Sequence, residues 1–221
     1  IYLDKNGQTT SKPEIGKPIP SGVTATSVLN NYFTAVGGEE KLKAISSSWL
    51  NYEASIQGMT LTLEIKNRAP NNTSVKIAMM GNVMSKQVFD GEKAYAEARG
   101  QKKEITGEEL ENMKLETKPF SEIGYLATAK LLKIEPIDGE DAYVLQVSKN
   151  KKAYYSTRSG LKLREVTTIK LPDGKDFQQG VDYSYYKEVN GILFPYIMSM
   201  KMGPQTLEFK LLSAKLNEGV G

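Results

Sequence analysis

The side chains of this sequence that could transfer protons are carboxylates, lysines and tyrosines, because its 221 residues include no histidine and no cysteine. Without histidine there can be no Ser/His/Asp triad, no HExxH or HxxEH helix and no histidine-ligated hydrolytic zinc. Without cysteine there can be no thiolate nucleophile, thiolate zinc site, iron–sulfur cluster or disulfide framework. The remaining acids and bases form no recognisable catalytic pair. We therefore expect no catalytic residues, no metal site and no cofactor.

Methionine is the other side chain with a suggestive distribution. Near the C-terminus, Phe194, Tyr196, Met198, Met200 and Met202 alternate with other residues and would share one face of a strand. Flexible, polarizable thioethers suit surfaces that accept varied apolar shapes, although they also fill ordinary cores against helices. Both interpretations stay open. Under the first, the residues predicted to line an apolar cavity are Met59, Leu61, Leu63, Met79, Met113, Phe194, Met198 and Met200.

The charges argue against two classes of partner. Lys and Arg number 29 against 26 Asp and Glu, a net charge of +3, and the two signs are interspersed. The nearest basic cluster, Gln101-Lys102-Lys103-Glu104, is too short for a phosphate-binding stripe, and we predict a solvated turn there. Apolar runs are far shorter than a bilayer requires. We expect no nucleic-acid partner and no transmembrane segment.

The N-terminal residues predict a linker. Residues 4–20 are rich in Pro, Gly, Lys and Thr, which favours extended chain. The sequence shows no signal-peptide pattern, so we expect that any targeting segment lies upstream or was removed. We therefore predict that residues 1–22 are a linker from a preceding domain and that residues 23–217 form a single domain.

Helices are predicted in two places. Apolar residues at spacings of three and four predict a helix over 26–36, with Thr26 as its N-cap and Gly37 at its end, followed by a short helix over 39–45. Glu39 and Glu40 would there oppose the helix dipole, a simpler role than catalysis. A further helix is predicted over 106–115, and residues 119–129 predict a helical or irregular cover over a sheet.

The rest of the chain has the period of two that is typical of strands. Turn-forming pairs such as Asp90-Gly91, Asp138-Gly139 and Asn190-Gly191 separate the runs, so consecutive strands should be hairpin neighbours. About twelve strands in one sheet would be unusual if flat, since long twisted sheets curl, split or close, and curling would give the sheet a hollow side. The predicted fold is α+β, a curved antiparallel half-barrel of about eleven to twelve strands covered by a few helices. The predicted strands are 47–56, 59–66, 73–80, 83–89, 93–98, 131–135, 142–148, 153–156, 161–170, 177–186, 193–202 and 206–216.

The order of these elements carries a resemblance. The AVGG helix end with EEKLKAI, the FDGEKAY hairpin, the TGEELENMK helix, the SGLKLRE strand and the VNGILFPY hairpin together resemble the LolA/LolB-like lipoprotein carrier superfamily over residues 24–216. The resemblance implies an open half-barrel of about eleven strands whose apolar cavity takes up the acyl chains of lipoproteins. It also implies a periplasmic or cell-envelope location. Its cargo-gripping arginine is matched to no residue here, because Arg68, Arg99, Arg158 and Arg164 lie in no matching motif.

The Pro-rich leader and AVGG helix are also similar to domains that follow insulinase/pitrilysin-type zinc peptidases in bacterial envelope proteins. That resemblance implies a parent protein whose zinc and HxxEH helix lie in the preceding domains, since this chain has no histidine. Those peptidase domains would then be a partner of this domain.

Three hypotheses follow. As a binding module, the chain would hold an apolar ligand in the hollow, with residues 106–129 as a movable cover. As an accessory domain it would dock on its parent, with Tyr183, Tyr185 and Tyr186 as interface candidates. As an independent enzyme it lacks the apparatus. A closed sheet without a cavity would count against the first hypothesis.

Overall fold

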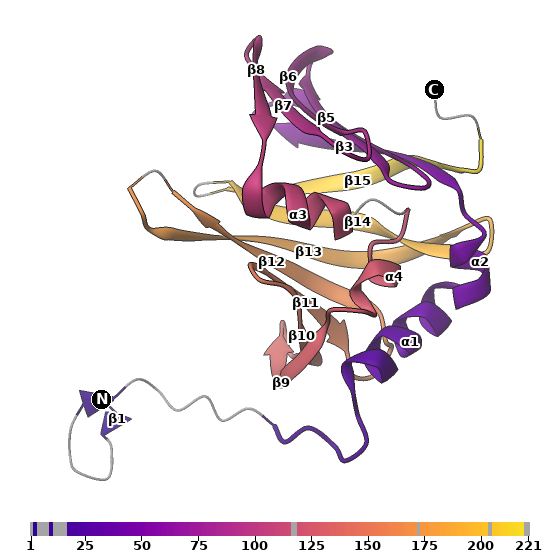
Figure 1. Cartoon of the computed structure of the whole chain (residues 1–221), viewed down its shortest axis with the longest axis vertical. Helices are drawn as coiled ribbons and strands as arrows, with labels where there is room; N and C mark the ends of the chain where they lie inside the picture. The colour runs from indigo at the N-terminus through magenta and orange to yellow at the C-terminus, as the bar shows by residue number, and fades with distance from the viewer. Residues whose placement is uncertain are drawn as a thin grey trace.

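The computed structural model describes residues 2–3, 9–10, 17–115, 119–171, 173–202 and 205–218, and within them one 13-stranded antiparallel sheet dominates (Figure 1). This confirms the predicted α+β half-barrel, with slightly more strands than expected. A separate pair is formed by β1 (Tyr2–Leu3) and β2 (Thr9–Thr10). The strands of the main sheet are β3 (Ser47–Ile56), β4 (Met59–Arg68), β5 (Asn72–Met79), β6 (Asn82–Phe89), β7 (Ala94–Ala98), β8 (Gln101–Ile105), β9 (Lys130–Ile137), β10 (Glu140–Ser148), β11 (Lys151–Ser156), β12 (Lys162–Lys170), β13 (Asp176–Val189), β14 (Ile192–Met202) and β15 (Gln205–Leu216).

The order of strands across the sheet is β8-β7-β6-β5-β4-β3-β15-β14-β13-β12-β11-β10-β9. Within β3–β8 and within β9–β15, consecutive strands are hairpin neighbours, as the turn residues predicted. The unforeseen pairing is between β3 and β15, which joins the first strand of the sheet to the last. The two edges, β8 and β9, are consequently strands from the middle of the chain. The described residues between these two edges, 106–115 and 119–129, lie over the hollow side.

The helix α1 (Ala25–Val36) begins one residue earlier than predicted, and its N-cap is Thr24, two residues before the predicted Thr26. The Ser27 amide donates to Thr24 Oγ1 at 3.1 Å, and the Thr24 amide donates to Ser27 Oγ at 2.9 Å, a reciprocal capping box. Its inner face buries Val28, Leu29, Tyr32, Phe33 and Val36.

The end of α1 confirms Gly37 as its terminator. Gly37 has φ 136°, and a Cβ there would lie 2.6 Å from the carbonyl oxygen of Gly191 in the β13–β14 turn. Only glycine allows this approach, so the AVGG segment and the VNG turn fit against each other. The short helix α2 (Glu39–Lys43) follows, with Glu39 and Glu40 in its first turn and Leu42 buried.

Two further helices belong to the segment that crosses the hollow. α3 (Gly107–Leu115) places Leu110 and Met113 against Phe89, Ala94 and Ile105, a small cluster near edge strand β8. α4 (Glu122–Tyr125) lies over the main core, with Phe120 just before it. In Figure 1 these helices and α1 lie on the same side of the sheet. The predicted helix over 106–115 and the cover over 119–129 are thus present.

The main core lies between the helices and one face of the sheet. Alternate residues of β3 and β4 enter it, with Tyr52 paired to Leu63 and Ala54 to Leu61, as the period of two predicted. The opposite face of the sheet carries polar residues, and on it Glu64 of β4 forms an ion pair with Lys76 of β5 at 2.8 Å. A smaller cluster of Ile137, Ala142, Val144 and Tyr154 is separate from the main core.

One segment was predicted wrongly. Residues 101–104 are not a solvated turn but most of β8, which pairs with β7 from Ala98–Gln101 to Ala94–Ile105. Polar residues occupy both faces of this strand because it is an edge, where only Ile105 is buried. The turn instead lies at Arg99-Gly100.

The C-terminal part of the predicted linker contacts an edge strand of the sheet. Lys17 forms an isolated antiparallel bridge with Ile134 of edge strand β9, and its ammonium group contacts Asp141 in an ion pair. Most of residues 1–16 lie outside the described part of the chain, so the role of 1–22 as a linker stays a prediction.

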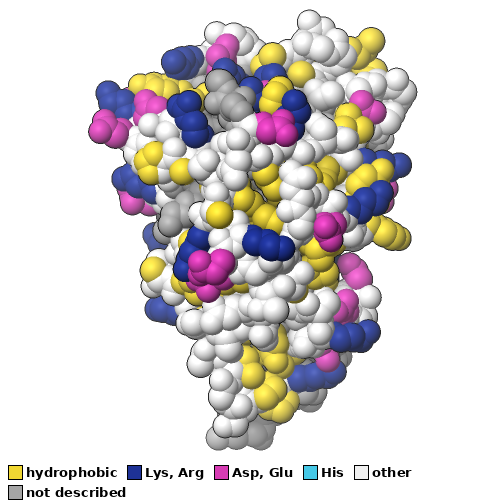
Figure 2. All heavy atoms as spheres, turned by 90° about the vertical axis from the view of Figure 1, so that its right-hand side faces the viewer, with side chains coloured by type: hydrophobic (Ala, Val, Ile, Leu, Met, Phe, Trp, Pro, Cys, Tyr) yellow, Lys and Arg dark blue, Asp and Glu magenta, His cyan; other side chains and the backbone are white. Residues whose placement is uncertain are grey.

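The surface agrees with the charge pattern of the sequence. Lysine, arginine and acidic side chains are mixed over the face drawn in Figure 2, with hydrophobic side chains between them. Of the helices in the described residues, none combines the length and apolar character needed to cross a membrane.

Candidate functional site

A cavity of about 270 Å³ lies on the helix-covered face of the sheet. Its walls come from α1, from the segment around α4, from β3–β5 and from β11–β14. The cavity is therefore in the hollow that the curling of the sheet predicted. Its lining residues are Tyr32, Leu50, Tyr52, Ile65, Asn67, Thr73, Val75, Pro119, Phe120, Ser121, Glu122, Tyr125, Lys151, Lys162, Glu165, Tyr183, Tyr186, Phe194, Pro195 and Met198.

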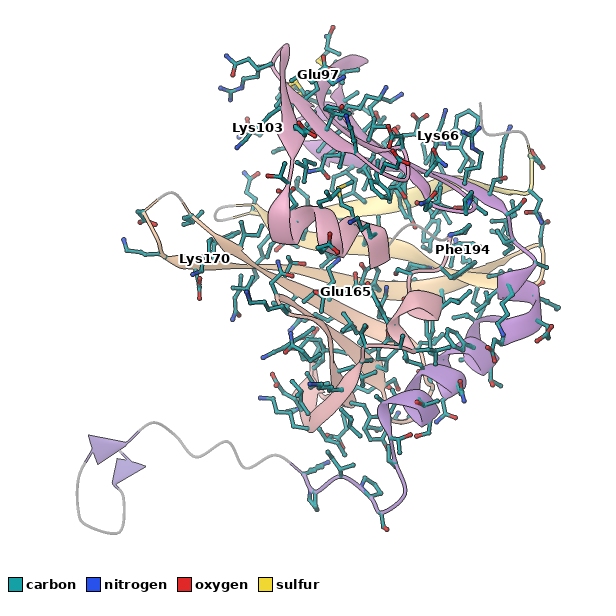
Figure 3. The ribbon with its side chains drawn as sticks, viewed as in Figure 1. Lys66, Glu97, Lys103, Glu165, Lys170 and Phe194 are labelled. Carbon is teal, nitrogen blue, oxygen red and sulfur yellow. The ribbon has the colours of Figure 1, made fainter. Side chains whose placement is uncertain are left out.

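The two sides of this cavity differ in chemistry. Strands β3–β5 contribute Leu50, Ile65 and Val75, all packed against the main core, and β14 contributes Phe194 and Met198. Phe194 also contacts Phe120 of the cover, with ring centroids 5.6 Å apart. Strands β11 and β12 contribute Lys151, Lys162 and Glu165 instead. Figure 3 labels Glu165 near the middle of the sheet and Phe194 closer to α2.

Lys162 is the centre of the charged side. Its ammonium Nζ donates to Glu122 Oε1 of α4 at 2.8 Å and to Glu165 Oε1 of β12 at 3.2 Å. The side chains of Lys162, Glu122 and Glu165 are only 11%, 3% and 14% exposed. Buried charges of this kind persist only when they are paired and hydrogen-bonded. The Lys162–Glu122 pair is thus the ionic contact through which α4 is attached to the sheet.

Tyrosines complete this network. The Tyr183 hydroxyl donates to Glu165 Oε2 at 2.8 Å, and the Lys162 ammonium lies 4.6 Å from the centre of the Tyr183 ring. The Tyr186 hydroxyl donates to the backbone carbonyl of Lys162 at 2.8 Å. Each oxygen of the Glu165 carboxylate therefore has a donor, and the floor of the cavity is rigidly oriented.

A β-bulge explains how Lys162 and Glu165 can share a face. Residues three apart on a regular strand point to opposite faces. Between β11 and β12 the register shifts, since Tyr154 pairs with Arg164 while Tyr155 pairs with Lys162. Leu163 is the extra residue, and it packs with the separate cluster around Tyr154. The bulge turns Lys162 inward while Glu165 keeps its place.

A second irregularity arranges the tyrosines of β13. Tyr185 has φ 52°, a left-handed conformation that is costly for a large side chain. Alternation breaks there, so Tyr183 and Tyr186 both line the cavity while Tyr185 is 73% exposed. Of the three tyrosines proposed from the sequence as interface residues, only Tyr185 is thus on the surface; the hydroxyls of Tyr183 and Tyr186 are committed to Glu165 and Lys162.

Electrostatics fixes the charge states of the network. Burial alone would raise the pKa of the Glu165 carboxyl, but Lys162, Lys151 and the hydrogen bond from Tyr183 hold it at about 2. Burial would likewise lower the pKa of Lys162, yet Glu122 and Glu165 raise it well above its ordinary value. Burial lowers the pKa of Lys151 against the attraction of Glu165. At neutral pH Lys162 and Glu165 are therefore a charged pair.

The residues predicted for the cavity divide into three groups. Phe194 and Met198 line it. Leu61, Leu63, Met79 and Met200 lie in or against the same main core without lining the cavity. Met59 is half-buried at the end of the β3–β4 hairpin, and Met113 packs in the small cluster at β8. Two other methionines of the early strands, Met80 and Met84, are exposed. Ligand contact by the predicted residues stays a prediction.

Sequence reasoning missed the charged half of the cavity. Lys162 and Glu165 stand within SGLKLRE, which drew attention only through its resemblance. Their own strand gave no clear signal, since Lys162, Arg164 and Glu165 alternate or mix with Leu161, Leu163 and Val166 as charged residues do on the solvent face of an ordinary strand. Glu122 stands alone between Phe120 and Ile123, an acid within an apolar cover.

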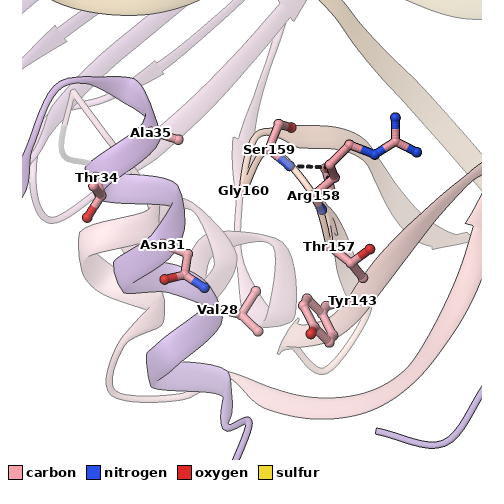
Figure 4. A pocket seen from close by; sticks show the side chains of 10 residues that line it. Val28, Asn31, Thr34, Ala35, Tyr143, Thr157, Arg158, Ser159 and Gly160 are labelled. Carbon is pink, nitrogen blue, oxygen red and sulfur yellow. Dashed lines mark hydrogen bonds between the residues drawn. The ribbon is translucent and has the colours of Figure 1, made fainter. Parts of the chain in front are cut away.

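A second hollow, of about 250 Å³, lies between α1 and the loop from β11 to β12 (Figure 4). Its walls mix polar and apolar residues, with Asn31 and Thr34 beside Val28 and Ala35 on the helix. Arg158 extends away from α1 in the figure, and its loop is held by the Ser159 amide, which donates to Ser156 Oγ at 2.9 Å. A Cβ at Gly160 would lie 3.0 Å from the Asn31 carbonyl oxygen. We interpret this hollow as a seam where the loop packs against the helix.

Comparisons with known proteins place the fold. No protein-family model matches the chain, and no curated protein matches its sequence. Among solved structures, a LolA superfamily protein from Nitrosomonas europaea is similar with TM-score 0.56 and 14% identity, over 90% of this chain and 96% of that one. A domain from Vibrio parahaemolyticus that carries the name outer membrane lipoprotein-sorting protein is similar with TM-score 0.50 and 11% identity, over 89% and 93%. The chain therefore has the LolA-like fold that its order of elements predicted.

Proposed function

We propose that this chain is a non-catalytic binding domain that holds an apolar ligand, the acyl chain of a lipid or lipoprotein or an apolar peptide, against the concave face of its sheet. The observation that carries the proposal is the cavity beneath α4, with Leu50, Ile65, Val75, Phe194 and Met198 in its walls. An alkyl chain placed there would be removed from water, which is favourable in proportion to the apolar area buried.

The size of the cavity implies a movable cover. Pockets for small ligands typically measure roughly 300–1,000 Å³, and this cavity, at about 270 Å³, is slightly smaller. A long acyl chain would therefore have to displace residues 119–129. Phe120, Glu122 and Tyr125 of that segment all line the cavity, so its movement would enlarge the space directly.

The fold supports this proposal. A domain named for outer membrane lipoprotein sorting is built on a similar sheet. By that analogy the chain would act in the periplasm or cell envelope, without chemistry of its own. The analogy concerns fold, whereas the binding role rests on the cavity.

The test uses the purified chain, one portion of which is extracted with organic solvent. Mass spectrometry of the extract would identify copurified lipid, and the uncharged dye phenylnaphthylamine would report apolar binding by its fluorescence. Val75→Phe would fill the cavity and should abolish dye binding. Val83→Phe, on the neighbouring strand β6 where Val83 is 54% exposed, is the matched control and should leave binding intact. Equal binding by both variants would contradict the proposed site.

The second candidate function is docking, as an accessory C-terminal domain, on the zinc-peptidase domains of a larger parent. The observation in its favour is the tip of the β12–β13 hairpin, where Ile169, Leu171 and Phe177 are each at least 40% exposed. Exposed apolar side chains gathered in one place mark interaction sites. Copurification with separately expressed upstream domains, abolished by Phe177→Ser, would support docking. Failure to associate at micromolar concentration would contradict it.

A further inference from the structure

The charged side of the cavity suggests which head group the ligand carries, an inference that rests on the proposed function. The sheet contributes two amino groups, Lys151 and Lys162, and one carboxylate, Glu165. With both amino groups protonated, these three side chains have a net charge of +1. Among the described residues of the cover that line the cavity, Glu122 has the one carboxylate, and it balances this charge when α4 is in place.

Loss of the Glu122 carboxylate would be unfavourable for the buried ammonium of Lys162. Its side chain is 11% exposed and its ammonium has two carboxylate partners, only one of which belongs to the sheet. A ligand that displaces α4 removes Glu122 and leaves a desolvated cation with half of its partners. A neutral ligand would not replace the lost acceptor, whereas an anionic oxygen would.

The arrangement also gives the ligand a direction. Leu50, Ile65 and Val75 lie on β3–β5, and Lys162 and Glu165 lie on β12, on the other side of the β3–β15 junction. An elongated amphiphile could place its tail along the first group and its head at the second.

We propose that the ligand is a long-chain amphiphile with one anionic oxygen group, and that this group takes the place of Glu122 on Lys162. Glu122 is then an internal stand-in for the head group, and α4 and the ligand compete for one cation. A quaternary ammonium head would instead meet Lys151 and Lys162, and an alcohol head would leave Lys162 under-paired.

The test is displacement of phenylnaphthylamine by amphiphiles with a common fourteen-carbon tail. Myristate is the carboxylate probe, with tetradecanol as the neutral probe and tetradecyltrimethylammonium as the cationic one. Myristate should displace the dye at a concentration about tenfold lower than tetradecanol, because a charge-assisted hydrogen bond is gained. Methyl hydrogen tetradecylphosphate, a singly charged phosphodiester, should match myristate if any anionic oxygen suffices.

Two variants separate this proposal from general apolar binding. Glu122→Gln removes the internal competitor and should strengthen myristate binding about threefold or more while tetradecanol binding changes less. Lys162→Met should abolish the preference for the anion. Lys76→Met, which breaks the ion pair with Glu64 on the other face of the sheet, is the matched control and should preserve the preference.

The outcomes are distinct. Dye binding with equal displacement by myristate and tetradecanol would overturn the head-group proposal and leave the apolar site standing. Preference for the quaternary ammonium would overturn it in the opposite sense. If Lys162→Met does not fold, the Glu122→Gln result decides, since unchanged or weaker myristate binding in that variant would overturn the proposal. Absence of dye binding in the unaltered chain would instead contradict the proposed function.

Discussion

The helices α1 and α4 both cover the concave face of the sheet, yet different interactions hold them there. α1 has 12 residues, a reciprocal capping box and five buried side chains on one stripe. α4 has four residues, no side-chain capping bond, and an ion pair from Glu122 to Lys162. Apolar burial is non-directional and insensitive to pH, whereas an ion pair depends on charge state and on a single geometry. The comparison suggests that α1 is a permanent wall and α4 a releasable one.

The largest loss of stability is expected from a substitution in α1, the permanent wall. Phe33 of α1 is 1% exposed within the main core. Phe33→Ala should lower the free energy of unfolding by about 4 kcal/mol, through lost transfer energy and the cavity that remains. Urea unfolding would measure it. Leu212→Ala, at a position 61% exposed, is the control and should change stability little. A pH-dependent penalty at Phe33 would contradict the contrast between the two helices.

The next effect is a pH dependence of the charged network on β12 to which α4 is attached. The folded-state pKa of Glu165 is about 2, below its ordinary 4.5, so its ionised form stabilises the fold. This contribution is complete well above pH 4.5 and is lost as the pH falls through the folded value. Between pH 6 and pH 2 the loss should be about 3 kcal/mol.

Urea unfolding at several pH values would measure this loss in the unaltered chain and in Glu165→Gln. The variant should lack this part of the pH dependence, because its amide does not titrate. If the two proteins lose stability in parallel from pH 6 to pH 2, the pairing of Glu165 with Lys162 does not have the strength inferred here.

The direct test of the attachment of α4 is Glu122→Gln. The change removes one charged acceptor from Lys162 while Glu165 remains, so the expected loss of stability is about 2 kcal/mol. Hydrogen exchange should speed up in residues 119–129 and stay unchanged in α1. The control is Glu111→Gln on α3, which breaks an exposed pair with Lys114 and should cost almost nothing. Uniform acceleration over both helices would argue against separate release.

The same contrast separates what the sequence could predict from what it could not. α1 and the paired strands β3 and β4 repeat their apolar residues at fixed periods, and periodicity is a local property. β8 was missed because Lys102, Lys103 and Glu104 stand on an edge strand where neither face is buried, so no alternation exists to detect.

The charged site depends on relations between distant segments. Lys162 points inward only because the register shifts at Leu163, and it meets Glu122 only because residues 106–129 cross from edge β8 to edge β9. Neither the bulge nor the β3–β15 pairing has a local sequence signal. The methionines illustrate the reverse limit, since a shared residue type does not ensure a shared location: Met198 lines the cavity, whereas Met113 packs in the small cluster at β8.

The smallest expected effect concerns the cap of α1. Thr24→Ala removes the hydroxyl that accepts from the Ser27 amide and should lower stability by about 1 kcal/mol. Because the five buried side chains of α1 remain, the helix should stay docked, and dye binding in the cavity should be unchanged. Thr24→Ser, which keeps the acceptor, should restore most of the stability. If Thr24→Ala weakened dye binding as strongly as it lowered stability, α1 would move together with α4, and the two coverings of the sheet would act as one cooperative unit.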